Sequence, residues 1–411
     1  MGQVEHRDGR VVVGAGVGPP DTHRLCAALH QAEQQGHAHI TLDFSACTGI
    51  TQAVMLPLMP IVTTCRERRD LVFSLLLPSD DGLSRLFVNT NWAHHIDPEA
   101  FQPNVHEGGH VPALRFEDDG ANGQDAILVR VMELILRKLD TSRDTLKAVE
   151  WSLGEIMENV PTHAESPVGG FVQATAYSGG NTVEFVVADG GIGIPASMGV
   201  ADDQSALRDA ITEGVTRDPR RNAGNGLFGS YQVAVLSDGA FELRSGWGLL
   251  RRIADGDLRT EQSTAPYPGT SVRCRVGLGD PGLLARALRF RGHSHDPPHD
   301  YLQREYEDDQ GAMIVNMKEK ASLDFGSRRG GRRMRRMVRN LLVGRSSIVL
   351  DFDGVGVITS SFADEFFGRL FVAMGPRAFM TRIRMINVDL TVEGLIDRAI
   401  LQRSRLGNSE D

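Results

Sequence analysis

Two short segments combine residue types and spacings that could do chemistry. In residues 151–164 (WSLGEIMENVPTHA), Glu155, Asn159 and His163 follow one another at steps of four on an otherwise apolar helix. They share one face, so this polar stripe must face either solvent or a pocket. In residues 222–236 (NAGNGLFGSYQVAVL), glycines run directly into a helix. The free N–H groups and the positive dipole end of such a helix favour an anion, which predicts an anion-binding site.

Two further segments complete an ordered set of motifs. In FVVADGGIGIP (185–195), a buried strand delivers Asp189 into a glycine turn, and YPGTSVRCRV (267–276) predicts Gly269 and Thr270 just before a strand. The order E-x-x-x-N, D-x-G-x-G, G-x-G-L before a helix, and G-T resembles the GHKL nucleotide-binding fold. That family includes DNA gyrase, a heat-shock chaperone, MutL, histidine kinases and anti-sigma serine kinases. The resemblance covers roughly residues 120–280; the alternative is an unrelated α/β domain whose glycines only turn corners.

The resemblance implies that ATP and Mg²⁺ are the ligands of this region. Asn159 would hold the Mg²⁺ ion, which prefers oxygen ligands. Glu155, one turn earlier, would polarise an attacking water or hydroxyl group, unless it is simply a solvated helix carboxylate. Asp189 would accept a hydrogen bond from the adenine amino group, with Thr270 supporting it directly or through water.

Glycines and a lid are also implied by the resemblance. Residues about 197 to 223 would form a mobile lid over the nucleotide, in which Arg220 and Arg221 contact phosphate or are merely solvated. His163 is either a neighbour of the nucleotide ligands or a packed residue. It is not expected to be a phosphoacceptor, because the sequence shows no separate dimerisation helix with a phosphoaccepting histidine. The backbone would approach the base at Gly191 and Gly193, and present amides to the phosphates at Gly224, Gly226 and Leu227.

Pro161 stands two residues after Asn159. A proline inside a helix removes one backbone hydrogen bond and clashes with the preceding turn, so the helix is predicted to end or kink there. One hypothesis is that this kink fixes the angle of the Asn159 turn. The alternative, which we favour, is a proline tolerated at a helix end. Unchanged nucleotide affinity and turnover in Pro161→Ala would refute the first.

The two ends of the chain repeat each other. HITLDFSACTGITQAVM (39–55) and SIVLDFDGVGVITSSFA (347–363) align without a gap at an offset of 308. In both copies strands alternate with helical patterns, which indicates βα units in a mixed or parallel sheet. Each end resembles a STAS-type domain, the fold of anti-sigma-factor antagonists.

In the STAS family a serine at the start of the helix after the LDF strand can be phosphorylated. This chain carries Ser360 and Ser361 there in the second copy, and Gln52 and Ala53 in the first. A phosphorylation switch therefore survives only in the C-terminal copy, if at all. The alternative is that one serine simply caps the helix. The N-terminal copy is expected to be a degenerate structural or dimerising module.

The predicted fold class is therefore α/β: a central GHKL α/β sandwich (Bergerat fold) flanked by two STAS-like βα domains. The predicted boundaries are 1–115 for the N-terminal STAS-like domain, 116–280 for the ATP-binding domain, 281–305 for a linker and 306–411 for the C-terminal STAS-like domain. A chain of 411 residues is too long for one typical core, which agrees with several domains.

Composition limits the kinds of site, the compartment and the ligands that are expected for this chain. Four scattered cysteines without a CxxC pair argue against a disulfide frame or a zinc knuckle, and no apolar run reaches the ~20 residues of a membrane helix. We therefore expect a cytoplasmic protein without a signal peptide. The net charge of −9 disfavours broad nucleic-acid binding. Only four of 44 basic residues are lysines, and no Walker loop is present.

Three other segments resemble functional motifs, but each also has an ordinary structural explanation. VGAGVGPP (13–20) looks like a dinucleotide loop, but its paired prolines predict a turn. His293, His295 and His299 fall in the proline-containing linker, where solvated histidines are commoner than a metal site. Residues 328–340 hold seven arginines on an amphipathic helix. That helix either docks on an acidic neighbour or contacts a nucleic acid or an acidic protein.

Three functions remain open from sequence. The first is an ATP-gated conformational switch with slow hydrolysis, by analogy a bacterial signalling or defence regulator. The second is a protein serine kinase of the anti-sigma type, with Ser360, Ser361 or a partner's serine as acceptor. The third is a nucleic-acid-associated scaffold whose grip by Arg328–Arg339 is gated by ATP, which is not favoured. A protein partner or a homodimer through the STAS-like ends is expected.

Overall fold

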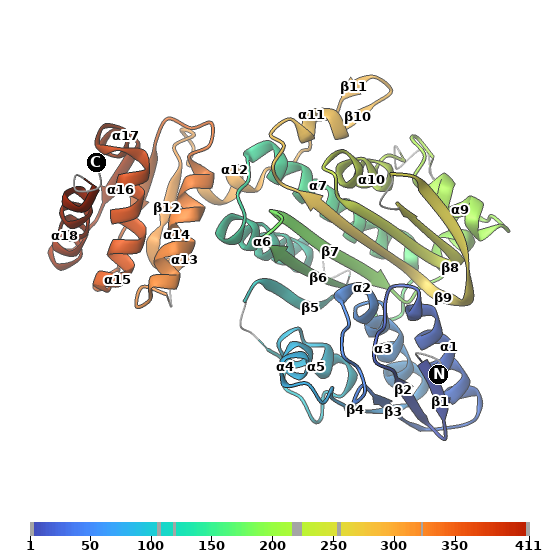
Figure 1. Ribbon diagram of the computed structural model, residues 1–411. Coiled ribbons are helices and arrows are strands. Elements are labelled where there is room, and N and C mark those ends of the chain that lie inside the picture. The colour runs from blue at the N-terminus through green and yellow to red at the C-terminus, as the bar shows by residue number, and fades with distance from the viewer. Residues whose placement is uncertain are drawn as a thin grey trace. The chain divides into compact units, whose positions relative to one another are not determined.

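Figure 1 shows the computed structural model, which describes residues 4–104, 108–117, 121–215, 224–252, 256–321 and 324–407. Within these residues the fold is mixed α/β and contains four sheets, which confirms the predicted α/β class. The chain forms two compact units. The first consists of residues 1–131, 148–277 and 283–296, and the second of residues 132–147, 278–282 and 297–411.

A four-stranded sheet begins the first unit. Its strands lie in the order β1 (Val4–Arg7), β2 (Arg10–Val13), β3 (His39–Asp43) and β4 (Val72–Leu76), and only the β1–β2 pair is antiparallel. The predicted alternation of strands and helices is confirmed, because helices separate β2 from β3 and β3 from β4 along the chain. The helices are α1 (Asp21–Gln34), α2 (Gln52–Met55), α3 (Leu58–Arg69), α4 (Asp81–Asn89) and α5 (Trp92–Ile96).

The second sheet of this unit is antiparallel throughout and holds five strands in the order β5-β6-β7-β9-β8. β5 (His110–Phe116), at the predicted boundary near residue 115, is an edge strand of this sheet. The other strands are β6 (Gly170–Tyr177), β7 (Thr182–Asp189), β8 (Ala240–Arg252) and β9 (Leu258–Gly277).

Helices of the central segment accompany this sheet (Figure 1). They are α6 (Ala121–Lys138), α7 (Arg143–Asn159), α8 (Gly193–Met198), α9 (Asp203–Ala210) and α10 (Gly226–Leu236). α7 buries the apolar residues that its 3.6-residue spacing predicts, among them Val149, Leu153 and Ile156. α10 packs against β8 and β9.

The end of α7 answers the question raised by Pro161. α7 stops at Asn159, and a single π-helical turn, Val160–Ala164, follows with Pro161 near its start. Glu165 then adopts a left-handed conformation with φ of 52°. Such π turns are rare and often occur at functional sites, because they change the direction in which side chains project. The predicted end of the helix at Pro161 is therefore confirmed.

β8 and β9 form a long hairpin that reaches beyond the rest of the sheet. The predicted strand start after Thr270 is therefore wrong, because β9 begins earlier in the chain. Gly269 and Thr270 do not precede a strand but lie inside β9. The β8–β9 ladder is irregular on either side of Gly246, and both Gly246 (φ 57°) and Gly269 (φ 93°) take conformations that favour glycine. Gly269 therefore marks a local distortion of β9 rather than the beginning of a strand.

The N-terminal sheet and its helices cover one face of the five-stranded sheet. Phe171, Val186 and Tyr267, from β6, β7 and β9, belong to the same buried apolar cluster as the N-terminal core. Two hydrogen bonds also hold the N-terminal domain against this sheet. Trp92 Nε1 donates to Gln173 Oε1 at 2.7 Å, and the Tyr267 hydroxyl donates to the Pro57 carbonyl at 3.0 Å. The N-terminal domain is thus part of the same compact body as the central sheet.

The second unit contains a three-stranded parallel sheet, ordered β12-β13-β14. This order matches that of the parallel strands β2-β3-β4, as the predicted repeat requires. Its elements are β12 (Ile314–Asn316), α13 (Met317–Ala321), α14 (Arg328–Leu341), β13 (Ile348–Asp351), α15 (Ser360–Ala363), a π-helical segment (Asp364–Gly368), α16 (Arg369–Met374), α17 (Pro376–Arg382), β14 (Ile383–Ile386) and α18 (Leu390–Gly407).

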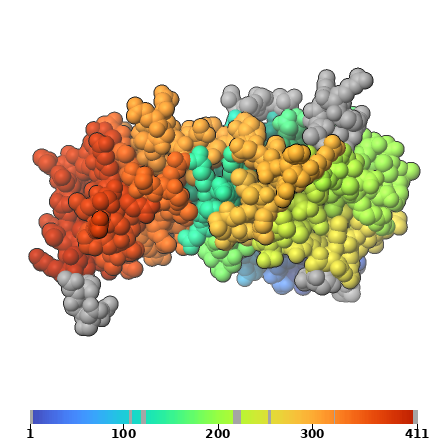
Figure 2. Space-filling model, turned by 90° about the horizontal axis from the view of Figure 1, so that it is seen from above, coloured from blue at the N-terminus to red at the C-terminus, as the bar shows by residue number. Residues whose placement is uncertain are grey.

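The segment predicted as a linker, 281–305, contains α11 (Leu283–Ala287) and a small hairpin of β10 (Arg289–Phe290) and β11 (His293–Ser294). α12 (Tyr301–Tyr306) begins at its end. The residues up to 296 that follow α11 belong to the first unit, and they lie on its surface (Figure 2).

Candidate functional site

A cavity of about 380 Å³ lies in the first unit, on the face of the five-stranded sheet opposite the N-terminal domain. α7, the π turn, β7, α8, β9 and the start of α10 all contribute to its wall. Segments more than 100 residues apart in sequence therefore meet in one place. Eight of the nine residues predicted for catalysis or nucleotide binding line it: Glu155, Asn159, Asp189, Gly193, Gly224, Gly226, Leu227 and Thr270.

The ninth, Gly191, does not line the cavity but supports a residue that does. Its backbone N–H donates to Asp189 Oδ1 at 2.8 Å. A side chain at this position would collide with the Ala164 carbonyl oxygen, 1.9 Å from where the Cβ atom would stand. The glycine is needed because the turn after β7 passes directly beneath the π turn, and not because it touches the cavity.

Asp189 is the most buried polar residue of the cavity wall, at 4% exposed. Its Oδ1 atom accepts two backbone hydrogen bonds, from Gly191 and from Thr270 (3.2 Å). Burial raises the pKa of Asp189 to about 6, and the two N–H donors oppose that rise. Among the described residues, no hydrogen bond reaches Oδ2, which leaves that oxygen as an acceptor for a ligand donor.

Ser245 on β8 ties the turns around Asp189 together, and sequence reasoning missed it. Its hydroxyl donates to the Gly269 carbonyl at 2.7 Å and accepts from the Ile194 N–H at 2.9 Å. A side chain at Gly193 would stand 2.6 Å from Ser245 Oγ, and one at Gly269 would stand 2.2 Å from the Asp189 carbonyl oxygen. A lone serine within a strand carries no sequence signal for this role.

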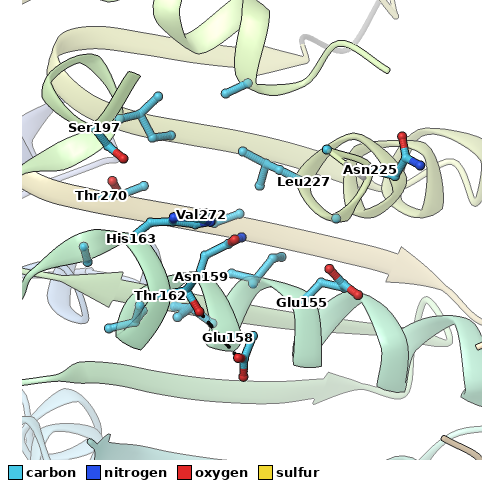
Figure 3. Close-up of a pocket in the computed structure, with 18 of the residues that line it drawn as sticks. Glu155, Glu158, Asn159, Thr162, His163, Ser197, Asn225, Leu227, Thr270 and Val272 are labelled. Carbon is cyan, nitrogen blue, oxygen red and sulfur yellow. Dashed lines mark hydrogen bonds between the residues drawn. The ribbon is translucent and has the colours of Figure 1, made fainter. Parts of the chain in front are cut away.

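Glu155 lies at the other end of the cavity, on the side of Asn225 and Leu227 (Figure 3). Burial, followed by the nearby negative charge of Glu158, raises the pKa of Glu155 above its usual range. Its Oε2 atom is only 2.3 Å from the position that a Cβ atom at Gly226 would occupy. The glycine at the start of α10 therefore makes room for the carboxylate.

Asn159 lies between these two ends, one turn after Glu155 (Figure 3). It is half-buried, and the hydrogen bonds found among the described residues include none from its side chain. Neighbouring Glu158 and Thr162 bond to each other at 3.4 Å instead. The polar stripe expected to face either solvent or a pocket thus faces the pocket.

The first turn of α10 is anchored to the residues before it. Asn225 Oδ1 accepts the Gly214 N–H at 3.2 Å, and Gly224, with φ of 70°, passes so close to Val215 that a Cβ atom would meet its carbonyl oxygen at 2.6 Å. α10 has 11 residues, so its amino end carries the partial positive charge of a full helix. The structure thus forms the glycine-to-helix start on which the predicted anion site depends.

Part of the predicted lid falls outside the described residues. Arg220 and Arg221 lie in the 216–223 stretch, so the structure says nothing about them. Within the described part, the predicted lid holds the end of α8 and all of α9, and Ser197 and Met198 line the cavity.

Sequence reasoning also missed two residues that close the Glu155 end. Phe290 and His295, around the β10–β11 hairpin, line the cavity together with Trp151. The three rings pack against one another in tilted orientations, with centroids 5.6–6.1 Å apart. The proline-rich composition of 291–300 had suggested a solvated linker, and only the fold brings it to α7. Among the described residues, no histidine, cysteine, aspartate and glutamate cluster could hold a metal ion by itself.

The two helices that follow the LDF strands begin in different environments. In the second unit, Ser360 is exposed at the first position of α15, whereas Thr359 caps the helix by accepting the Phe362 N–H at 3.3 Å. Ser361 donates to or accepts from Thr359 at 3.1 Å. The predicted capping role therefore belongs to Thr359, one residue earlier. In the first unit, Gln52 at the equivalent position is buried and donates to Glu184 Oε1 at 3.0 Å.

α14 carries the seven arginines predicted on an amphipathic helix, with Met334, Met337, Val338 and Leu341 buried. Carboxylates of the same unit neutralise most of the positive charge. The ion pairs are Arg328–Asp364, Arg332–Glu365, Arg333–Asp324, Arg335–Glu365 and Arg336–Asp140. This observation favours docking on an acidic neighbour over contact with a nucleic acid.

Comparisons with known proteins identify part of the second unit only. Residues 330–393 match the family described as a STAS-like domain of unknown function (DUF4325), which agrees with the C-terminal STAS-like prediction. No GHKL domain is detected in this comparison. No curated protein matches the chain. Among the described residues, the helices are all too short or too polar to cross a membrane.

Proposed function

We propose that the cavity binds a magnesium-bound adenine nucleotide on a GHKL-type sandwich, and that the protein is an ATP-gated switch with slow hydrolysis. In this proposal the STAS-like domains at both ends carry the change to a protein partner. One observation carries the proposal: a single cavity gathers the ordered motif residues from α7, β7, α10 and β9. Glycines that merely turned corners would have no reason to converge with Glu155 and Asn159.

The buried end of the cavity fits the base. Asp189 offers a carboxylate oxygen in an apolar wall formed in part by Val187, Ile194 and Val272. The amino group of adenine is a hydrogen-bond donor, whereas guanine carries a carbonyl oxygen at the same place. A carboxylate held by Gly191 and Thr270 therefore accepts from adenine and repels guanine.

The opposite end fits the phosphates. The amino end of α10 supplies N–H groups at Gly226 and Leu227, and Glu155 stands beside it. Mg²⁺ usually takes one or two protein oxygens and completes its shell with phosphate oxygens and water. Asn159 provides one such oxygen, and the lack of a larger ligand cluster among the described residues agrees with an ion that arrives with the nucleotide. When bound, the ion would neutralise phosphate charge.

Calorimetry with the full chain tests the proposal. Wild type is expected to bind ATP in the presence of Mg²⁺ and to prefer it to GTP by roughly a hundredfold or more, because guanine leaves a buried polar group unpaired. Asp189→Asn should lower ATP affinity about ten- to a hundredfold and reduce the preference. Absence of binding heat with folded wild type, or equal affinity for ATP and GTP, would contradict the proposal.

The pKa of Asp189 predicts a pH dependence of this binding. With a pKa of about 6, the side chain is a carboxylate at pH 7 and is protonated for the most part at pH 5. A proton on Oδ2, the oxygen left for the base, turns that acceptor into a donor, so affinity should fall about tenfold between pH 7 and pH 5. Asp189→Asn serves as the control, since its residual pH dependence reports all other groups. Parallel curves for the two proteins would count against the role of Asp189.

A further inference from the structure

The charges around the cavity are unusual for a site that holds a triphosphate. Its wall contains three carboxylates, Glu155, Glu158 and Asp189. Among the described residues of the wall there is no lysine or arginine, and the only basic side chains are two histidines, His163 and His295. Within the described part of the wall, these two histidines are therefore the candidate cations for a terminal phosphate.

The two histidines occupy opposite ends of the cavity. His163 lies on the π turn near Thr270, toward the end that fits the base (Figure 3). His295 lies against Trp151, with ring centroids 5.7 Å apart. Trp151 precedes Glu155 by four residues on α7, so the two side chains are neighbours on one helix face. His295 is thus the basic residue on the Glu155 side.

The hairpin holds His295 in place. Its two-residue turn has φ of 49° at Arg291 and 81° at Gly292, the paired positive values typical of a tight hairpin. Arg289 Nε donates to the Gly292 carbonyl at 3.1 Å, and the His295 N–H donates to the Leu288 carbonyl at 2.8 Å. These bonds fix the backbone of the hairpin up to His295.

Aromatic packing and one polar contact seat the hairpin on the nucleotide-binding elements. Phe290 is 8% exposed and contacts Trp151 and Phe228, from α7 and α10. Trp151 itself lies so close to Gly229 that a Cβ atom there would meet the indole at 2.4 Å. The Arg291 N–H also donates to Glu213 Oε1. The hairpin is therefore part of the wall rather than a free connection.

We propose that His295 contacts the outermost phosphate of the bound nucleotide, so that the hairpin makes the site select a triphosphate over a diphosphate. This inference rests on the proposed function, since it needs an adenine nucleotide oriented with its phosphates toward α10. An imidazole edge donates one N–H to a phosphate oxygen, and only a triphosphate reaches the Glu155 end. ADP, which ends one phosphate earlier, makes no such contact.

The test compares two nucleotides on the full chain by calorimetry, ADP and the non-hydrolysable triphosphate AMP-PNP, both with Mg²⁺. His295→Ala should lower AMP-PNP affinity about ten- to a hundredfold, as expected for a hydrogen bond to a charged group, and leave ADP affinity within twofold. His295→Gln, which keeps an N–H donor, should recover part of the loss. His293→Ala is the matched control, because His293 is exposed on the same hairpin and does not line the cavity.

The outcomes separate this inference from the function on which it rests. Equal losses for ADP and AMP-PNP, or no loss for either, would overturn the role of His295 while leaving nucleotide binding intact. Retained ADP binding shows at the same time that the variant is folded. Failure of wild type to bind either nucleotide would overturn both proposals.

Discussion

Replacing Glu155 with glutamine is expected to slow ATP hydrolysis by about 10²–10⁴-fold, the usual contribution of a positioned general base. Burial and the charge of Glu158 raise the pKa of Glu155, which makes its carboxylate a stronger base toward a water molecule at the α10 end. Glutamine has nearly the same shape and fits beside Gly226, so nucleotide affinity should stay within a few-fold. The measurement is phosphate released from ATP labelled at its terminal phosphate, together with label retained on the protein.

Glu158→Gln is the matched control for this experiment. Glu158 is an exposed carboxylate on the same helix that also lines the cavity, and it bonds to Thr162 instead of facing α10. Burial is the larger cause of the raised pKa of Glu155, so removing the charge of Glu158 should slow hydrolysis by no more than about a few-fold. A comparable loss in both variants would show that only the negative charge of the cavity matters. Stable label on wild-type protein, lost in Ser360→Ala or Ser361→Ala, would instead support the serine-kinase alternative.

The second large effect is expected on stability. Glu184→Ala should lower the free energy of unfolding by about 3–5 kcal/mol, the usual cost of removing one partner of a buried ion pair. The Glu184 side chain is 1% exposed and accepts from Arg273 and Arg275, each at 2.8 Å, and from Gln52. Without it, two arginines lose an acceptor and Gln52 keeps only the backbone carbonyl of residue 184, at the contact between the N-terminal domain and the sheet. Urea unfolding followed by circular dichroism measures the difference.

Glu261→Ala provides the comparison for Glu184→Ala. Glu261 pairs with Arg251 at 2.8 Å on the β8–β9 hairpin but is 41% exposed, so its loss should cost less than about 1 kcal/mol. Similar effects from both substitutions would contradict the structural role assigned to Glu184.

Burial raises the pKa of Glu184, but the arginines more than offset this, so its folded-state pKa lies below normal. Its stabilising contribution is therefore present above the unfolded-state pKa and is lost as the pH falls through the folded-state pKa.

Local sequence patterns predicted the elements well wherever one residue period dominates. The alternation in HITLDF and the helical spacing of Val149, Leu153 and Ile156 lead directly to β3 and α7. The motif residues were found because glycines at steric contacts, such as Gly191 and Gly226, leave a visible pattern in the sequence. The periodic patterns depend on neighbours that are close in the chain, whereas the glycines are visible because of their residue type, although their contacts, Ala164 and Glu155, are distant in sequence.

The rest of the site depends on residues brought together from distant parts of the chain. Ser245 reaches the Gly269 turn from another strand, and Phe290 and His295 come from a segment whose composition resembles a linker. No spacing rule connects them to Trp151, since their partners are set by how the hairpin folds back. For the same reason, the burial of Gln52 against Glu184 could not be read from the repeat that it shares with Ser360.

Strand β7 has both of its faces occupied. Glu184 and Val186 serve the N-terminal domain, whereas Val187 and Asp189 serve the cavity. Because side chains alternate along a strand, inserting or deleting one residue there would exchange the two sets and disrupt both at once. The end of the β8–β9 hairpin carries no such double constraint, because no side chain of this arm from residue 256 to 264 is buried. Over evolutionary time, natural variation in length should therefore accumulate in that arm and be absent from β7.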